Sequence, residues 1–348
     1  MVRTVRHRLR LWVVLKLSLA LGLVLPCAAS SQSYRPPRHT AAPSPLLVGA
    51  GSELELGLRA DAGTQIEQDR SPAEELAEHR KLESALAALG RQRAGTVDAY
   101  VVAIALDSDP VFGREARAAA EVLARRYGAQ GRTLVLAGTD GRAPSALPRG
   151  TPGTLAIALA RVAELMDRNE DALVLYTTSH GAPFGLYYND GDHGYGAVSP
   201  NRLRRMLDGL GLRNRLLILS ACYSGVFVPV LQSPATAIVT AASADRTSFG
   251  CAADNDWTFF GDALINRALR KPQPLPAAFT EAQGLIAGWE AQVRQPPSQP
   301  QIQVGALAGR WLDPLERRIP QTATAPVGRP AIETTVPPRP VLGGVRQR

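Results

Sequence analysis

Apolar runs of strand length alternate with helical segments from about residue 96 to residue 310. Strands are expected at 97–106, 133–136, 235–240 and 301–304, and at two further runs that end near residues 180 and 222. The intervening helices are expected at 114–127, from 151, 199–210, 257–269 and 279–293. Such alternation predicts an α/β fold: a mostly parallel sheet with helices on both faces, joined by right-handed crossovers. A domain of about 210 residues can bury a substantial core.

One of these strands ends in a cysteine. Leu216 to Gly225 reads Leu-Leu-Ile-Leu-Ser-Ala-Cys-Tyr-Ser-Gly, and four consecutive aliphatic residues are typical of a strand buried on both faces. The chain then turns at Ser224 and Gly225. Cys222 therefore falls just beyond the carboxyl end of a strand, where ligands bind in open α/β sheets. Taken alone, the pattern suits a nucleophile or a buried structural cysteine equally well.

A second stretch has the same construction and ends in a histidine. Ala172 to Gly181 reads Ala-Leu-Val-Leu-Tyr-Thr-Thr-Ser-His-Gly. If the two strands are parallel neighbours, His180 and Cys222 lie on one edge of the sheet, roughly 5–10 Å apart at the backbone. A thiol that faces an imidazole is the arrangement of a cysteine nucleophile and its base. His180 alone would be read as a core or capping residue; the matched pair favours catalysis.

The N-terminus has the pattern of a secretory signal. Five cations precede or interrupt an apolar segment that ends near Leu25: Arg3, Arg6, Arg8, Arg10 and Lys16. Small residues that suit cleavage follow, so residues 1–30 are expected to be a signal peptide and the protein to be exported, periplasmic or secreted. An uncleaved membrane anchor is the alternative, although the apolar part is short for a spanning helix. Pro26 before Cys27 is a poor fit to a lipoprotein signal.

The charge and the cysteines exclude several classes of protein. The formal net charge is +8, and removal of the five N-terminal cations leaves +3. The sequence has no basic stripe with interleaved aromatic residues, so a nucleic-acid partner is not expected. Beyond the signal only Cys222 and Cys251 remain, which is no disulfide framework. They either pair with each other, or Cys222 stays free to react.

The segments on either side of this domain lack a clear period. Residues 31–95 are predicted to be a low-complexity arm with one helix, which begins at Ser71-Pro72 and ends near Leu89. From residue 313 the proline, threonine and arginine content rises, and a disordered tail is expected to 348. The domain proper is therefore placed at 96–312. Within it, residues 183–198 flank an Asn-Asp-Gly turn and predict a hairpin.

Several blocks of sequence resemble a known family. The His-Gly block at 179–181 and the Ala-Cys block at 220–225 are similar to those of the caspase–legumain group of cysteine peptidases. The longer blocks 241–251 and 258–262 resemble the peptidase C13 (legumain) family, especially its bacterial exported members. The resemblance extends in order over about residues 97–306. It implies a caspase-like three-layer sandwich around a six-stranded central sheet.

The resemblance also implies roles for particular residues. Cys222 would be the nucleophile and His180 the general acid/base, with the oxyanion held by the backbone N–H groups of Gly181 and Cys222. The primary specificity pocket would be lined by residues that match the family's positions: Arg114, Ser220, Ser248 and Asp262. Opposite charges on Arg114 and Asp262 would suit an asparagine amide, which both donates and accepts hydrogen bonds.

The sequence departs from legumain at two of these positions. Ser220 replaces a glutamate two residues before the nucleophile, which weakens the case for strict asparagine specificity. Ser179 replaces an aspartate before the histidine and leaves the dyad unaffected. Cys251 reads as buried structure. A metal site is not expected, because the acids around Asp190 lack the closing ligand of a calcium loop and suit a polar hairpin tip.

The expected function is that of a cysteine endopeptidase that cuts through a Cys222–His180 dyad and a thioester, after asparagine or aspartate. The alternatives are a transamidase with the same dyad, in which an amine intercepts the thioester, and a non-catalytic envelope binding module. No cofactor is expected. The partners would be peptide or protein substrates, with possible membrane attachment through the N-terminal segment; the sequence does not determine the oligomeric state.

Overall fold

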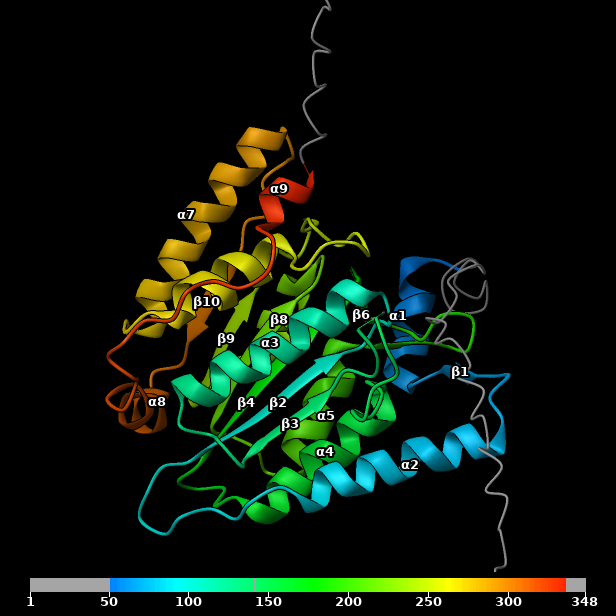
Figure 1. Cartoon of the computed structure of the whole chain (residues 1–348), viewed down its shortest axis with the longest axis horizontal. Helices are drawn as coiled ribbons and strands as arrows, with labels where there is room; N and C mark the ends of the chain where they lie inside the picture. The colour runs from blue at the N-terminus through cyan, green and yellow to red at the C-terminus, as the bar shows by residue number, and fades with distance from the viewer. Residues whose placement is uncertain (1–50, 141, 336–348) are drawn as a thin grey trace, which may run out of the picture. The chain divides into compact units, whose positions relative to one another are not determined.

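The computed structural model describes residues 51–140 and 142–335. At its centre is a six-stranded sheet with the strand order β10-β9-β8-β4-β2-β3 (Figure 1). Its strands are β2 (Ala99–Ala105), β3 (Thr133–Leu136), β4 (Ala172–Thr178), β8 (Arg215–Ser220), β9 (Thr236–Thr240) and β10 (Gln301–Val304). Only the pair of β9 with β10 is antiparallel among these six strands. The predicted fold class, an α/β sandwich around a mostly parallel six-stranded sheet, is confirmed.

Helices cover both faces of this sheet, and the alternation of side chains along the strands explains why. Val101 and Ala103 of β2 join one apolar cluster, whereas Tyr100 and Val102 join another. The first cluster packs against α3 (Pro110–Arg126), the π-helix η3 (Gly261–Arg267), η4 (Ala268–Arg270), α7 (Leu275–Val293) and α8 (Gly309–Glu316). The second packs against α2 (Pro72–Ala87), α4 (Pro152–Leu165), α5 (Pro200–Gly209) and α6 (Val228–Leu231). Figure 1 shows α3 along one face of the sheet.

Three helix starts differ from their prediction, and one of them is that of α7, which begins at Leu275 and not at 279. Helix α3 begins at Pro110 and not at residue 114, as was expected. Pro110 stands in its first turn, after the N-cap residue Asp109, so the loop that the composition of Asp107 to Pro110 indicated is shorter. The helix expected from Trp257 begins two residues later, at Phe259, and continues as η3 from Gly261. The hydroxyl of Thr258 accepts the Gly261 N–H, and residues 251–258 form a loop before the helix.

A second, smaller sheet follows β4 and has the order β1-β7-β6-β5. The strands β6 (Gly185–Asn189) and β7 (Gly194–Val198) form the predicted hairpin, and β5 (Gly181–Ala182) lies beside β6. The strand β1 (Gln65–Glu67) pairs with β7 and comes from the N-terminal arm. This small sheet stands directly after His180.

The arm has more structure than the single helix that was predicted. In addition to α2, it forms α1 (Glu53–Ala62) and β1. A capping box between Ser52 and Glu55 begins α1, but only Ala60 of that helix is buried, so no apolar period marks it in the sequence. The carboxylate of Asp61 accepts a hydrogen bond from Ser199, the residue that caps α5.

The expected disordered tail is wrong for residues 313–335. Helix α8 runs through residue 313, and α9 (Ala331–Thr335) ends the described chain. Between them the backbone of Val327 bonds to Asn266 and accepts the indole N–H of Trp257. Ala331 is buried and donates its N–H to Asp262 at 2.9 Å. Backbone groups make these contacts, which explains why a segment without apolar period is nevertheless held.

The predicted signal peptide, residues 1–30, lies outside the described residues. Export therefore stays a prediction from the sequence. Within 51–140 and 142–335, the structure has no helix with the length and apolar character that crossing a membrane requires.

Candidate active site

Cys222 stands where β8 ends. Every residue of β8 is buried, and the chain leaves the sheet through Ala221 into a tight turn. The residue after the cysteine, Tyr223, has a left-handed backbone with φ of 57°, a conformation uncommon for a non-glycine residue and often associated with functional sites. The short helix η2 (Ser224–Phe227) follows. This turn brings the half-buried thiol of Cys222 out at the sheet edge.

His180 occupies the equivalent place after β4. Its side chain is 41% exposed, and its Nε2 lies 3.7 Å from a carboxylate oxygen of Asp109. The edge of Phe112 packs on the imidazole, with 5.0 Å between ring centroids. Burial lowers the pKa of His180, but the interaction with the nearby Asp109 carboxylate and the charges of Asp107 and Asp109 outweigh it, so the net pKa is raised. The charged imidazolium is thereby favoured.

The structure brings these two strand ends together. Strands β4 and β8 are parallel neighbours with Thr178 opposite Ser220, and the Ser179 N–H donates to the Ser220 carbonyl at 3.1 Å. The backbone comes closest at Gly181, where a Cβ would overlap the carbonyl oxygen of Cys222. Gly181 is required here because only a residue without a side chain permits this approach.

The thiol of Cys222 is contacted by Ser248. The Ser248 N–H donates to Sγ at 3.3 Å, and the Ser248 carbonyl oxygen lies 3.5 Å from the same sulfur. A backbone N–H directed at sulfur stabilises negative charge on it. Of the predicted pocket residues, Ser248 is the one that lies against the nucleophile candidate.

Cys251 stays a separate thiol. Neither Cys222 nor Cys251 is in a disulfide. The sequence left two alternatives, a disulfide between them or a free Cys222, and the structure has the free Cys222. Cys251 packs beside an apolar cluster that contains Phe112. Burial, followed by the nearby charge of Cys222 and of acids that include Glu115, raises the pKa of Cys251 well above its usual value. It therefore stays protonated.

Two predicted pocket residues are engaged elsewhere. Arg114 donates to the carbonyl oxygens of Ala253 and Asn255, and its ion pair is with Asp256 at 3.5 Å. Its guanidinium is therefore held by protein groups, and its expected place in a pocket for an amide side chain stays a prediction.

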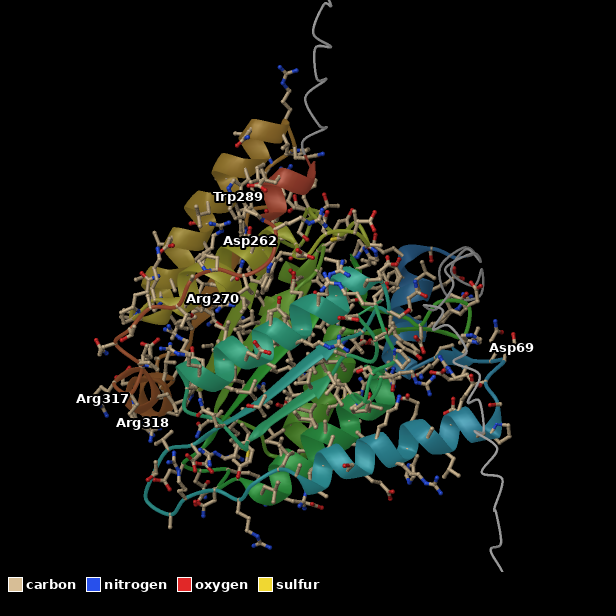
Figure 2. The ribbon with its side chains drawn as sticks, in the orientation of Figure 1. Asp69, Asp262, Arg270, Trp289, Arg317 and Arg318 are labelled. Carbon is tan, nitrogen blue, oxygen red and sulfur yellow. The ribbon has the colours of Figure 1, made fainter. Side chains whose placement is uncertain are left out.

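Asp262 is fully buried on the α7 side, near Trp289 in Figure 2. Its carboxylate accepts from Arg267 at 3.1 Å and from Asn266 at 2.9 Å. The guanidinium of Arg267 in turn stacks on Trp289. A carboxylate with these partners holds η3 and the C-terminal segment, so we no longer place Asp262 in the substrate pocket.

Comparison with known proteins places this site in a family. The model of the peptidase C13 family matches residues 154–310, which include His180, Cys222 and Ser248. This region belongs to the peptidase C13 family. The protein is therefore a cysteine-type peptidase, and its partners are peptide or protein substrates.

Two further comparisons complete this one. No curated protein matches the sequence. Among solved structures, caspase-1 from Spodoptera frugiperda is similar with a TM-score of 0.41 and 15% identity, over 62% of this chain and 92% of that chain.

The candidate site contains a buried acid that the sequence analysis missed. One carboxylate oxygen of Glu115 accepts three hydroxyl bonds: from Tyr176 at 2.5 Å, Thr178 at 2.9 Å and Ser220 at 2.9 Å. The other accepts the Thr258 N–H at 2.8 Å. The predicted pocket residue Ser220 thus points to Glu115. The available signal was the spacing: Glu115 lies four residues after Val111 and four before Ala119, on the apolar face of the helix.

Two hollows lie next to the peptidase site, on the side of the small sheet. A cavity of about 200 Å³ is lined by His180, Asp107 and residues of the β6–β7 hairpin. A wider cleft of about 610 Å³ shares Asp107 and Asn189 with it. In that cleft Asp190 accepts from Arg70 at 2.5 Å and from Arg149 at 3.4 Å. The hairpin acid is therefore bound by two guanidinium groups.

Proposed function

We propose that the protein is an endopeptidase in which Cys222 is the nucleophile and His180 the general acid/base. The observation that carries this proposal is the register of β4 and β8, which sets the two residues beside each other at the carboxyl edge of the sheet. The raised pKa of His180 supports a protonated imidazole, the proton donor that the leaving amine needs, and the Ser248 N–H places a hydrogen-bond donor at Sγ.

The reaction would be acyl transfer. The Cys222 thiolate attacks the peptide carbonyl carbon, and a tetrahedral oxyanion forms. His180 gives its proton to the amine nitrogen as the carbon–nitrogen bond breaks, which leaves a thioester on Cys222. His180 then takes a proton from water, whose oxygen attacks the thioester; the carbon–sulfur bond breaks, the carboxylic acid leaves, and the Cys222 thiolate and the protonated His180 are restored.

We assign the oxyanion donors to the N–H groups of Gly181 and Cys222. Within the described residues, no protein acceptor takes the N–H of Cys222. Gly181 lies opposite Leu186, next to the pair in which Tyr187 donates to the His180 carbonyl. Positions in an antiparallel ladder alternate, so the Gly181 N–H points away from β6. Two free donors next to the thiol suit a developing oxyanion.

Cleavage after asparagine or aspartate is proposed as a preference and not as strict selectivity. Arg114 and Ser248 remain as pocket candidates, whereas Asp262 is bound to Arg267 and Asn266. A pocket that offers only some of the hydrogen-bond partners of the asparagine amide distinguishes asparagine from other side chains less well than a pocket that offers all of them. A digest of a peptide library would measure this selectivity directly.

The test compares two cysteines in one chain. An electrophilic peptide probe should label the wild type and the Cys251→Ser variant, and both should cleave peptides. Cys222→Ala should do neither, while its thermal unfolding stays close to that of the wild type. His180→Ala should lose about 10²- to 10⁴-fold in kcat/KM.

Cleavage that persists in Cys222→Ala would reject the assignment. The same digest with and without an added amine, read by mass spectrometry, separates hydrolysis from transamidation. Absence of labelling at Cys222 in the folded wild type would favour a non-catalytic binding module.

A further inference from the structure

The cavity beside His180 has no part in the chemistry assigned to the dyad. It measures about 200 Å³, and its lining includes His180, Asp107 and three tyrosines: Tyr187, Tyr188 and Tyr195. The Tyr187 N–H donates to the carbonyl of His180 at 3.0 Å, so one wall is attached directly to the acid/base. A hollow of this size admits one large side chain but not a folded ligand of drug size.

The strand order fixes where this cavity lies relative to the nucleophile. Cys222 follows β8, His180 follows β4, and Asp107 follows β2, and these three strands are consecutive neighbours in the sheet. Neighbouring strands lie about 4.8 Å apart. The thiol, the imidazole and the cavity therefore come in that order along the edge, with His180 between the other two.

The direction of the reaction then identifies the occupant. With the scissile carbonyl over Cys222, the leaving amine must reach His180, which protonates it. The residue that carries that amine continues in the same direction. We propose that the cavity binds the side chain of the residue immediately after the scissile bond, and that it selects a large apolar or aromatic side chain there. This inference rests on the proposed dyad.

The chemistry of the lining supports this selectivity. Burial raises the pKa of Tyr188 and of Tyr195, so both phenols are neutral at physiological pH. Asp107 places an acid at the cavity, held by the Asp109 N–H at 2.9 Å. An apolar side chain gains from leaving water here, whereas an acidic side chain would meet Asp107 as a like charge.

The far wall depends on the N-terminal arm. Gly196 of β7 lines the cavity and is paired with Gln65 of β1. A Cβ at Gly196 would meet the Gln65 side chain and Tyr188 at 3.5 Å. Because β1 supports the strand that carries Tyr195 and Gly196, residues before the family match help to shape this subsite.

The experiment uses the full chain and peptides that are identical up to the cut. The residue after the cut is leucine, phenylalanine, glycine or aspartate. We expect kcat/KM about 10- to 100-fold higher with leucine or phenylalanine than with glycine, and lowest with aspartate. Tyr187→Ala and Tyr195→Ala should reduce the leucine-to-glycine ratio, whereas Tyr187→Phe, which keeps the ring, should preserve it.

The results that would overturn the subsite differ from those that would overturn the proposed function. Equal rates with all four peptides, or a ratio unchanged in both alanine variants, would overturn the subsite while leaving the peptidase intact. If no peptide is cleaved, calorimetric binding of the same four peptides to Cys222→Ala makes the comparison without turnover. Equal affinities there would overturn the subsite on their own. Half-buried Tyr187 is the safer variant, because Tyr195 is only 4% exposed.

Discussion

At the scale of single residues, the environment of His180 departs most from what its sequence neighbours indicate. The acid beside it, Asp109, comes from the start of α3, about 70 positions earlier in the chain. It is the N-cap residue of that helix but makes no capping bond with its side chain. Its carboxylate lies 3.7 Å from the imidazole nitrogen, and we propose that Asp109 acts as a positioning residue for His180.

Asp109→Asn should test this role through pH. Asparagine is also a good N-cap, so α3 should remain. Without the carboxylate the pKa of His180 should fall, because the acid favours the imidazolium. If the active form needs protonated His180, the alkaline limb of kcat/KM should move to lower pH in the variant.

The raised pKa of His180 also makes the free energy of unfolding depend on pH, and Asp109→Asn should alter this dependence. A histidine whose folded pKa is raised contributes stability that is present below its unfolded pKa, about 6.5. That contribution is lost as the pH rises through the folded value. Denaturant titrations should therefore show a larger deficit for Asp109→Asn at mildly acid pH than at alkaline pH. An alkaline limb that does not move would show that Asp109 leaves the acid/base unaffected.

At the scale of elements, one carboxylate holds two strand ends in register. Glu115 of α3 binds Thr178, two residues before His180, and Ser220, two residues before Cys222. Its other oxygen accepts from Thr258, ahead of η3. No cation pairs with Glu115 among the described residues, so hydroxyl and N–H donors alone satisfy the buried charge. We infer that helix α3 thereby sets the spacing of the proposed dyad.

Removal of single hydroxyls should separate spacing from stability. We expect Thr178→Val and Ser220→Ala each to cost about 1 kcal/mol of unfolding free energy, and each to reduce kcat by about 10-fold because the dyad shifts. Thr240→Val is the matched control: its buried hydroxyl donates to Ala242 at 3.0 Å, at the end of β9. It should cost similar stability.

The control separates the two effects because Thr240 has no bond to Glu115. Stability is measured by urea unfolding and kcat with a saturating peptide. A reduction of kcat in Thr240→Val as large as in the other two variants would indicate general loosening. It would remove the case for Glu115 as the group that sets the spacing.

The elements show why the sequence predicted some of this site and not the rest. Cys222 and His180 each end an unbroken apolar run, so local pattern alone places them at a sheet edge. Glu115 belongs to α3 and Asp109 directly precedes it, and their partners are fixed only when that helix packs on β2 and β4. Asp262 was misplaced for the converse reason: its partners Arg267 and Ala331 depend on η3 and the C-terminal segment.

At the scale of the whole molecule, the segment after α8 is part of the peptidase unit. Thr322 accepts from Arg125 of α3 at 2.8 Å, and Val327 accepts from Trp257 at 2.8 Å. The Arg329 N–H donates to Asp256 at 2.9 Å. Residues 253–257 also supply the carbonyl groups that hold Arg114. The segment therefore braces the loop that leads from Ser248 to η3.

Truncation after Pro320 should destabilise the protein by about 2–5 kcal/mol, since it removes several partly or fully buried hydrogen bonds at about 1 kcal/mol each and the packing of Ala331. It should also lower kcat/KM through the Ser248 loop. A chain that ends at Thr335 is the control, because it keeps every described contact. Calorimetry and peptide cleavage measure the two effects. An unchanged melting temperature after truncation at Pro320 would contradict this account.

The elements that precede the family match determine which segments must be expressed together. Residues 154–310 contain both dyad candidates, but a gene fragment cut to that match would omit β2, β3 and α3. It would leave one long edge of β4 open to pairing with other chains and the hydroxyls of Thr178 and Ser220 without their acceptor. Cloning boundaries should therefore begin before Ser52, where the cap of α1 lies, and continue through Thr335.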